Sequence, residues 1–157
     1  MNAIVMYYSR SGTTKKVAET IASKLGCEIE ELVDTQKRKG IIGFLKSGRQ
    51  AIKGTLTTLQ PIKNDVSQFD MVVLGTPVWG GHMSVPILTF ITQNKENLPD
   101  IALFMTAGGT GNEENISSAV EMLSGKKIKA TLNLSASQVK KDQFMEKLQA
   151  FVDAIKG

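Results

Sequence analysis

The stretch Ala3-Ile4-Val5-Met6-Tyr7-Tyr8, followed at once by Ser9-Arg10-Ser11-Gly12-Thr13-Thr14, decides how this 157-residue sequence folds. The first six residues form a continuous apolar run, which is typical of a strand buried on both faces of a parallel sheet. The next six are small and polar, and apolar residues at helical spacing follow them as far as Leu25. The stretch therefore predicts a strand, a turn and a helix, the unit from which parallel α/β sheets are built.

The same unit recurs along the chain. Two further apolar runs are each followed by a turn and a helical pattern, and we expect Pro77 to end the first of them. Strands alternating with helices predict an α/β fold, with helices on both faces of a doubly wound parallel sheet, and the length predicts a single domain over residues 1–157. Further strands are expected at residues 28–33, 71–76, 101–106 and 129–135, and a last helix at residues 140–156.

Composition excludes several classes of protein. Hydrophobic residues make up 41% and charged residues 22%, which excludes a disordered chain, and no apolar run is long enough to span a membrane. The single cysteine, Cys27, and the single histidine, His82, argue against a disulfide or a metal site. The net charge, 19 − 15 = +4, is too small to indicate nucleic-acid binding. Without a signal sequence and with one cysteine, we expect a cytoplasmic protein.

In a doubly wound sheet, ligands bind beyond the carboxyl ends of the strands, so the loops after the three buried strands are the candidate site. The first loop, residues 9–14, offers hydroxyl groups, a glycine and the free amides of the coming helix. Amides at a helix N-terminus favour a phosphate group, although an ordinary capped turn would have a similar sequence. The loop is neither a P-loop nor a dinucleotide fingerprint.

The second and third loops are rich in glycine. Trp79 is followed by Gly80 and Gly81, and this combination fits either a flat ligand or a tryptophan packed in a tight turn. The third loop, residues 106–111, is open to the same two interpretations, close approach of its backbone to a ligand or a plain turn. Together the three loops indicate a ligand with a phosphate tail and a planar polar ring.

In length, element order and these three loops, the sequence resembles the flavodoxins. The phosphate loop of that family is Thr/Ser-x-Thr/Ser-Gly-x-Thr, and Ser9, Ser11, Gly12 and Thr14 occupy its defined positions. The resemblance implies a five-stranded parallel sheet of order 2-1-3-4-5 that binds FMN. It assigns Ser9, Ser11, Gly12 and Thr14 to the phosphate, residues 77–81 to the ring and residues 106–111 to its pyrimidine edge. The full set of residues predicted to bind the cofactor is Ser9, Arg10, Ser11, Gly12, Thr13, Thr14, Thr76, Pro77, Val78, Trp79, Gly80, Gly81, Thr106, Ala107, Gly108, Gly109, Thr110 and Gly111.

The resemblance implies an electron-transfer protein that shuttles electrons between partner proteins. The flavin does the chemistry in such proteins, so no catalytic side chain and no metal ligand is expected. The alternative is a small FMN-dependent quinone or flavin reductase, which would accept hydride from NAD(P)H. The third loop lacks the aromatic residue that often covers the flavin in the family, and an open ring favours this alternative.

Flavodoxins that act as free carriers are usually acidic, whereas this chain is basic. Between residues 34 and 60 lies a basic cluster, which fits docking of an acidic redox protein or a phosphorylated cofactor, and also an ordinary solvated surface. His82 adjoins the second loop and is expected at the surface, whereas Cys27 is expected to be a small buried residue. The cluster consists of Lys37, Arg38, Lys39, Lys46, Arg49 and Lys53.

Overall fold

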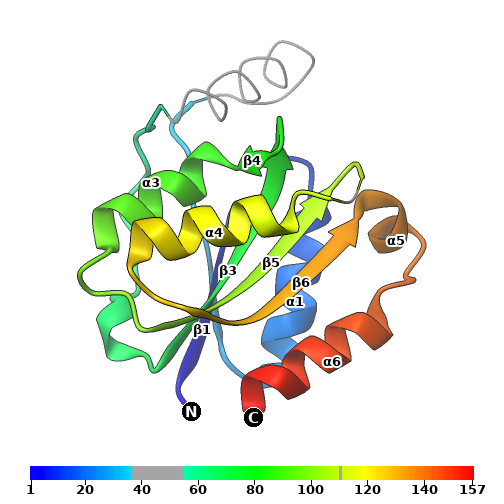
Figure 1. Ribbon diagram of the computed structural model, residues 1–157. Coiled ribbons are helices and arrows are strands. Elements are labelled where there is room, and N and C mark those ends of the chain that lie inside the picture. Colours follow the sequence, from blue (N-terminus) through cyan, green and yellow to red (C-terminus); the bar gives the residue numbers. More distant parts are fainter. Residues whose placement is uncertain (37–54, 110) are drawn as a thin grey trace.

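The computed structural model of the protein describes residues 1–36, 55–109 and 111–157. It has a central sheet with helices on both faces (Figure 1). The elements follow one another as β1 (Ala3–Tyr7), α1 (Thr13–Leu25), β2 (Glu28–Glu31), a short 3₁₀ helix (Val66–Gln68), β3 (Met71–Trp79), β4 (His82–Met83), α3 (Val85–Asn94), β5 (Asp100–Ala107), α4 (Glu113–Ser124), β6 (Ile128–Ser135), α5 (Ala136–Lys140) and α6 (Met145–Lys156). The basic cluster lies outside the described residues.

The sheet has the predicted topology. Its strands lie in the order β2-β1-β3-β5-β6 and pair in parallel, which is the order 2-1-3-4-5 once the short strand β4 is set aside. β4 pairs antiparallel with the end of β3. The predicted α/β fold with a doubly wound sheet is therefore confirmed. No described helix is long and apolar enough to cross a membrane.

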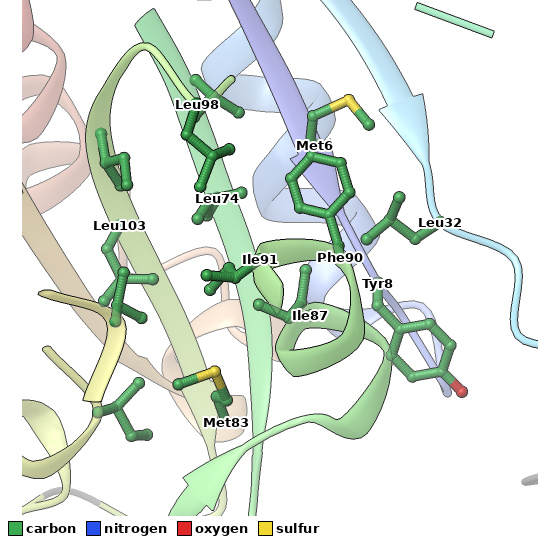
Figure 2. Close-up of a cluster of buried hydrophobic side chains, with 14 of the residues drawn as sticks. Met6, Tyr8, Leu32, Leu74, Met83, Ile87, Phe90, Ile91, Leu98 and Leu103 are labelled. Atoms are coloured by element: carbon green, nitrogen blue, oxygen red, sulfur yellow. The ribbon is translucent and has the colours of Figure 1, made fainter. Parts of the chain in front are cut away.

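The core consists of two apolar layers, one on each face of the sheet. Figure 2 shows part of the first layer, in which Phe90 and Ile91 of α3 pack near Leu74 of β3. Helices α1 and α6 cover the other face, where Ile21 and Leu148 are fully buried. Each such side chain stabilises the fold by about 1.5–3 kcal/mol, so the two layers fix the strand ends that carry the loops.

Two boundaries differ from the sequence-based prediction. Pro77 does not end β3, which continues to Trp79. β1 pairs with β3 only as far as Gly75, so β3 has one free side beyond this point, and a proline without an N–H group is tolerated there. The predicted helix at residues 140–156 is two helices, because the chain turns at Asp142, whose φ is 55°, before α6 begins.

Gly75 is a close-packing position that the sequence analysis missed. It pairs with Phe104 of β5, and a Cβ atom at Gly75 would lie 2.1 Å from the Phe104 ring. Glycine at this position therefore leaves room for the fully buried ring over the neighbouring strand. This packing lies just before both strands lead into the loops of the candidate site.

Candidate functional site

The three predicted loops meet in one cavity of about 230 Å³ at the carboxyl edge of the sheet. This is the edge at which β1, β3 and β5 end (Figure 1). The cavity also reaches the start of α5. Its lining consists of Arg10, Ser11, Thr13, Thr14, Pro77, Val78, Trp79, Thr106, Ala107, Gly108 and Ala136.

The first loop ends in a helix N-terminus with free amide groups. Gly12 is the N-cap of α1, with φ 95°, and no side chain caps the helix. The first intrahelical bond runs from the Lys16 N–H to the Gly12 carbonyl at 3.0 Å, so the amides of Thr13, Thr14 and Lys15 precede it. The first turn contains no acidic residue. These features make the helix end a suitable site for an anion.

Hydroxyl groups tie the first loop to itself and to the third loop. Ser9 Oγ accepts a hydrogen bond from the Gly12 N–H at 3.1 Å, which closes the turn. Thr14 Oγ1 and Thr106 Oγ1 lie 2.7 Å apart, and both residues are buried. One hydroxyl of this pair donates to the other, so one hydroxyl proton remains available to a ligand. The pair therefore holds α1 against the end of β5 and keeps one donor free.

The second loop is a tight hairpin. Gly80 and Gly81 connect β3 to β4 and have φ values of 56° and 81°, the combination that a type I′ turn requires. Trp79 is 4% exposed and packs edge-on against Tyr8, with ring centroids 5.5 Å apart. The Thr76 hydroxyl is also buried, and it donates to Ser84 Oγ and accepts from the Ser84 N–H. The hairpin is thus stabilised by its own turn and by the contacts of β3 with Tyr8 and Ser84.

The third loop leaves empty space. Among the described residues, no heavy atom lies within 4 Å of the position of a Cβ at Gly108 or Gly109, and neither glycine has a φ in the left-handed region. Neither the backbone conformation nor the neighbouring packing therefore requires glycine at these two positions. Thr110 lies outside the described residues, and Gly111 has a φ of 109°.

The cavity brings together about half of the residues predicted for the site. Among the others, Gly12 and Ser9 shape the first loop, whereas Thr76 and Gly81 shape the hairpin. Ala136 was not predicted. The capping box formed by Ser135 and Gln138 starts α5 there, and the Ser-x-x-Gln spacing in the sequence could have indicated this helix start. Predicted residues outside the lining are Ser9, Gly12, Thr76, Gly80, Gly81, Gly109 and Gly111.

Few titratable groups lie near the cavity. Arg10 is the one titratable residue in the described lining. Tyr7 lies at the end of β1, its hydroxyl donates to Glu31 Oε2 at 3.1 Å, and burial raises the pKa of this tyrosine well above its usual value. His82 is exposed, whereas Cys27 is half-buried, and burial raises the pKa of its thiol. No described group of His, Cys, Asp and Glu side chains could hold a metal ion.

The chain is similar to several solved structures of flavoproteins. A flavoprotein from Lactobacillus acidophilus in complex with FMN is 28% identical over 89% of this chain and 97% of its own, with a TM-score of 0.73. A flavodoxin from the domain Archaea is 17% identical over 99% and 97%, with a TM-score of 0.63. An NAD(P)H:quinone oxidoreductase from Methanothermobacter marburgensis is 14% identical over 98% and 95%, with a TM-score of 0.57.

Neither the models of protein families nor the curated proteins gave a match. The similarity to these solved structures, together with the sheet order, shows that the chain has a flavodoxin-like fold. The resemblance found in the sequence is thereby confirmed.

Proposed function

We propose that the protein binds FMN in the three-loop cavity and carries electrons between redox partners. The observation that carries this proposal is the composition of the cavity, which is bordered by an uncapped helix N-terminus and by open glycine backbone. The similar flavoprotein from Lactobacillus acidophilus was crystallised with FMN, which supports the choice of cofactor.

The residues present fit FMN. The amides of Thr13, Thr14 and Lys15 would hold the phosphate, with the remaining hydroxyl proton of the Thr14–Thr106 pair as a further donor. The backbone after Ala107 would hold the polar edge of the ring, because Gly108 and Gly109 leave space there. Pro77, Val78 and Trp79 supply the apolar side of the cavity. A phosphate monoester with a flat polar ring matches all three loops.

The absence of acid–base side chains in the described lining supports a carrier. When bound, the flavin supplies the redox chemistry, and the protein contributes binding, orientation and electrostatics. The described lining contains no His, Cys, Asp, Glu or Tyr, and its one charged side chain is that of Arg10. An enzyme that protonates its substrate would need such a group within hydrogen-bond reach, whereas an electron carrier does not.

The partner in this proposal is a redox protein of acidic character. The sequence between residues 37 and 54 contains six Lys and Arg residues and no Asp or Glu. Without these six charges, the net charge of the chain would be +4 − 6 = −2. The basic character of the chain is therefore concentrated in one segment, and such a concentration favours association with an acidic surface.

One observation favours a second candidate, an FMN-dependent NAD(P)H:quinone or flavin reductase. Trp79 is the only aromatic residue in the described lining, and the sequence of the third loop contains none. A ring covered by one aromatic residue leaves a face on which a nicotinamide or quinone could stack. This candidate shares the FMN site with the carrier and differs in what reaches the ring.

Two experiments test these proposals. Apoprotein titrated with FMN and with riboflavin should bind FMN more tightly, because only FMN has the phosphate; equal affinities would contradict the site. Holoprotein is then mixed with NADPH without oxygen. Bleaching of the flavin only after a separate reductase is added supports the carrier, whereas rapid direct bleaching contradicts it and supports the reductase.

A further inference from the structure

Arg10 supplies the positive charge of the three-loop cavity, because it is the one charged residue in the described lining. It lies in the first loop, two residues before Gly12, so the Cα atoms of the two residues are at most about 7 Å apart. From that distance, the side chain of an arginine is long enough to reach an anion held at the start of α1. The cavity thus combines the neutral amides of a helix N-terminus with a full positive charge.

Hydrogen bonds fix the backbone on both sides of Arg10. Before it, the Tyr8 N–H donates to the Gly75 carbonyl of β3 at 3.1 Å. After it, the Gly12 N–H donates to Ser9 Oγ at 3.1 Å, which places Arg10 within a closed turn. A loop that already has a defined shape loses little backbone entropy when a ligand binds to it.

The two lysines that follow the loop are paired outside the cavity. Lys15 Nζ lies 3.6 Å from Glu31 Oε2, and Lys16 Nζ lies 2.6 Å from Asp142 Oδ1. Neither lysine is among the described residues that line the cavity, and no carboxylate is among them either. Arg10 therefore determines the charge that the described side chains of the lining present to a ligand.

We propose that Arg10 is a specificity residue, which selects ligands that carry a phosphate dianion by pairing with the phosphate at the start of α1. This inference rests on the proposed function, because it takes the FMN phosphate as the group that is bound. Guanidinium and phosphate form charge-assisted, often bidentate hydrogen bonds, which are about twice as strong as neutral ones. The amides and hydroxyls bind the phosphate oxygens, whereas Arg10 makes the affinity depend on the phosphate charge.

Titration of apoprotein with FMN and with riboflavin, which lacks the phosphate, tests this role. Arg10→Gln should raise the FMN Kd by about tenfold or more and leave the riboflavin Kd within about twofold of the wild type. Because salt screens charge pairs, the FMN Kd should rise more steeply with ionic strength in the wild type than in the variant. Arg10→Lys keeps the charge without the bidentate geometry, so it should lose less FMN affinity than Arg10→Gln.

Lys16→Gln is the matched control. It removes the same charge from the first turn of the same helix, but at a residue outside the described lining. Both Kd values should stay within about twofold of the wild type, because Lys16 is paired with Asp142 and exposed charges are screened. An equal loss of FMN affinity in Lys16→Gln and Arg10→Gln would show an effect of net charge alone and would overturn the proposal.

Two further outcomes of the titrations would also overturn it. An unchanged FMN Kd in Arg10→Gln would show that the amides and hydroxyls suffice for the phosphate. An equal rise of the FMN and riboflavin Kd values would place the guanidinium group at the ring.

Inorganic phosphate separates this inference from the proposed function, because it tests Arg10 without a flavin. Phosphate should raise the Tm of wild-type apoprotein more than that of Arg10→Gln, since a ligand that binds only the folded state stabilises it. The same effect of phosphate on both proteins, or no effect on either, would overturn the role of Arg10. Wild-type protein that responds to phosphate but does not bind FMN would instead contradict the proposed function. Arg10 is only partly buried, and the Tm without ligand reports whether the variant folds.

Discussion

The two glycine-rich loops of the cavity look alike in sequence and differ in what their glycines do. In the hairpin, Gly80 and Gly81 adopt positive φ values that the turn itself requires. In the third loop, Gly108 and Gly109 adopt ordinary φ values beside empty space. Where the described structure does not require glycine, we expect the glycine to make room for a bound ligand. The comparison thus separates a loop shaped by its own turn from one that leaves room for a ligand.

In the first loop, Gly12 both adopts a positive φ and leaves room beside the phosphate site. We therefore expect the largest loss of FMN affinity from a substitution at Gly12. Gly12 has a φ of 95° and caps the helix that would bind the phosphate. Gly12→Asp places a carboxylate beside a dianion, and the repulsion should weaken FMN binding by about a hundredfold or more. Titration of apoprotein by flavin fluorescence measures the change.

Gly12→Asn is the matched control, because asparagine has nearly the same shape and tolerates positive φ but carries no charge. It should retain most of the FMN affinity. Equal loss in both variants would show that the backbone, and not the charge, is the cause. Unchanged binding in Gly12→Asp would mean that the phosphate lies elsewhere.

In the hairpin, glycine substitution should act on stability. Alanine at a positive φ costs about 1–2 kcal/mol per residue, so the double variant Gly80→Ala, Gly81→Ala should lower the free energy of unfolding by about 2 kcal/mol or more. At Gly81 the new Cβ would also lie 3.3 Å from Asn112 Oδ1. Urea denaturation of the apoprotein measures the loss. A variant as stable as the wild type would show that the hairpin turn does not require glycine at these two positions.

In the third loop, the same substitution should act on binding. The double variant Gly108→Ala, Gly109→Ala adds two methyl groups in open space and relieves the unfolded chain of some conformational entropy, so stability should be unchanged or slightly higher. FMN affinity should fall by about tenfold, the equivalent of about 1.4 kcal/mol, because the ring edge loses its close approach to the backbone. Loss of stability without loss of FMN affinity would show that the third loop needs its glycines for folding and not for binding.

The sequence was sufficient to predict the arrangement of the strands and helices, but it was insufficient to predict where strands end and how the loops turn. Continuous apolar runs predicted the three buried strands, and their spacing from helical patterns predicted the sheet. Pro77 misled the prediction, because a local rule for proline cannot show that β1 ends at Tyr7 and leaves β3 a free side. Similarly, Phe144 fits the spacing of the last helix, although the chain turns just before it.

The candidate site could be predicted as a set of loops and not as a set of contacts. The hydroxyl motif predicted the first loop, but the Thr14–Thr106 pair joins residues far apart in the sequence, so no local pattern reveals it. The glycines after Trp79 suggested both a ligand and a tight turn. Their φ values identify the turn, and only the three-dimensional structure contains that information.

Trp79 provides the smallest and most specific test of the hairpin. It is the only tryptophan, so the fluorescence of the apoprotein reports this ring alone. If the ring borders the bound flavin, FMN should quench its emission strongly. Trp79→Phe keeps an aromatic ring against Tyr8 and should weaken FMN binding by less than about 1 kcal/mol, the typical energy of an aromatic pair beyond its buried area. Tyr8→Leu is the control, since it removes the edge-on contact but leaves Trp79 in place. Unquenched emission would show that the tryptophan serves only to pack the hairpin, and the role of the second loop would then be structural throughout.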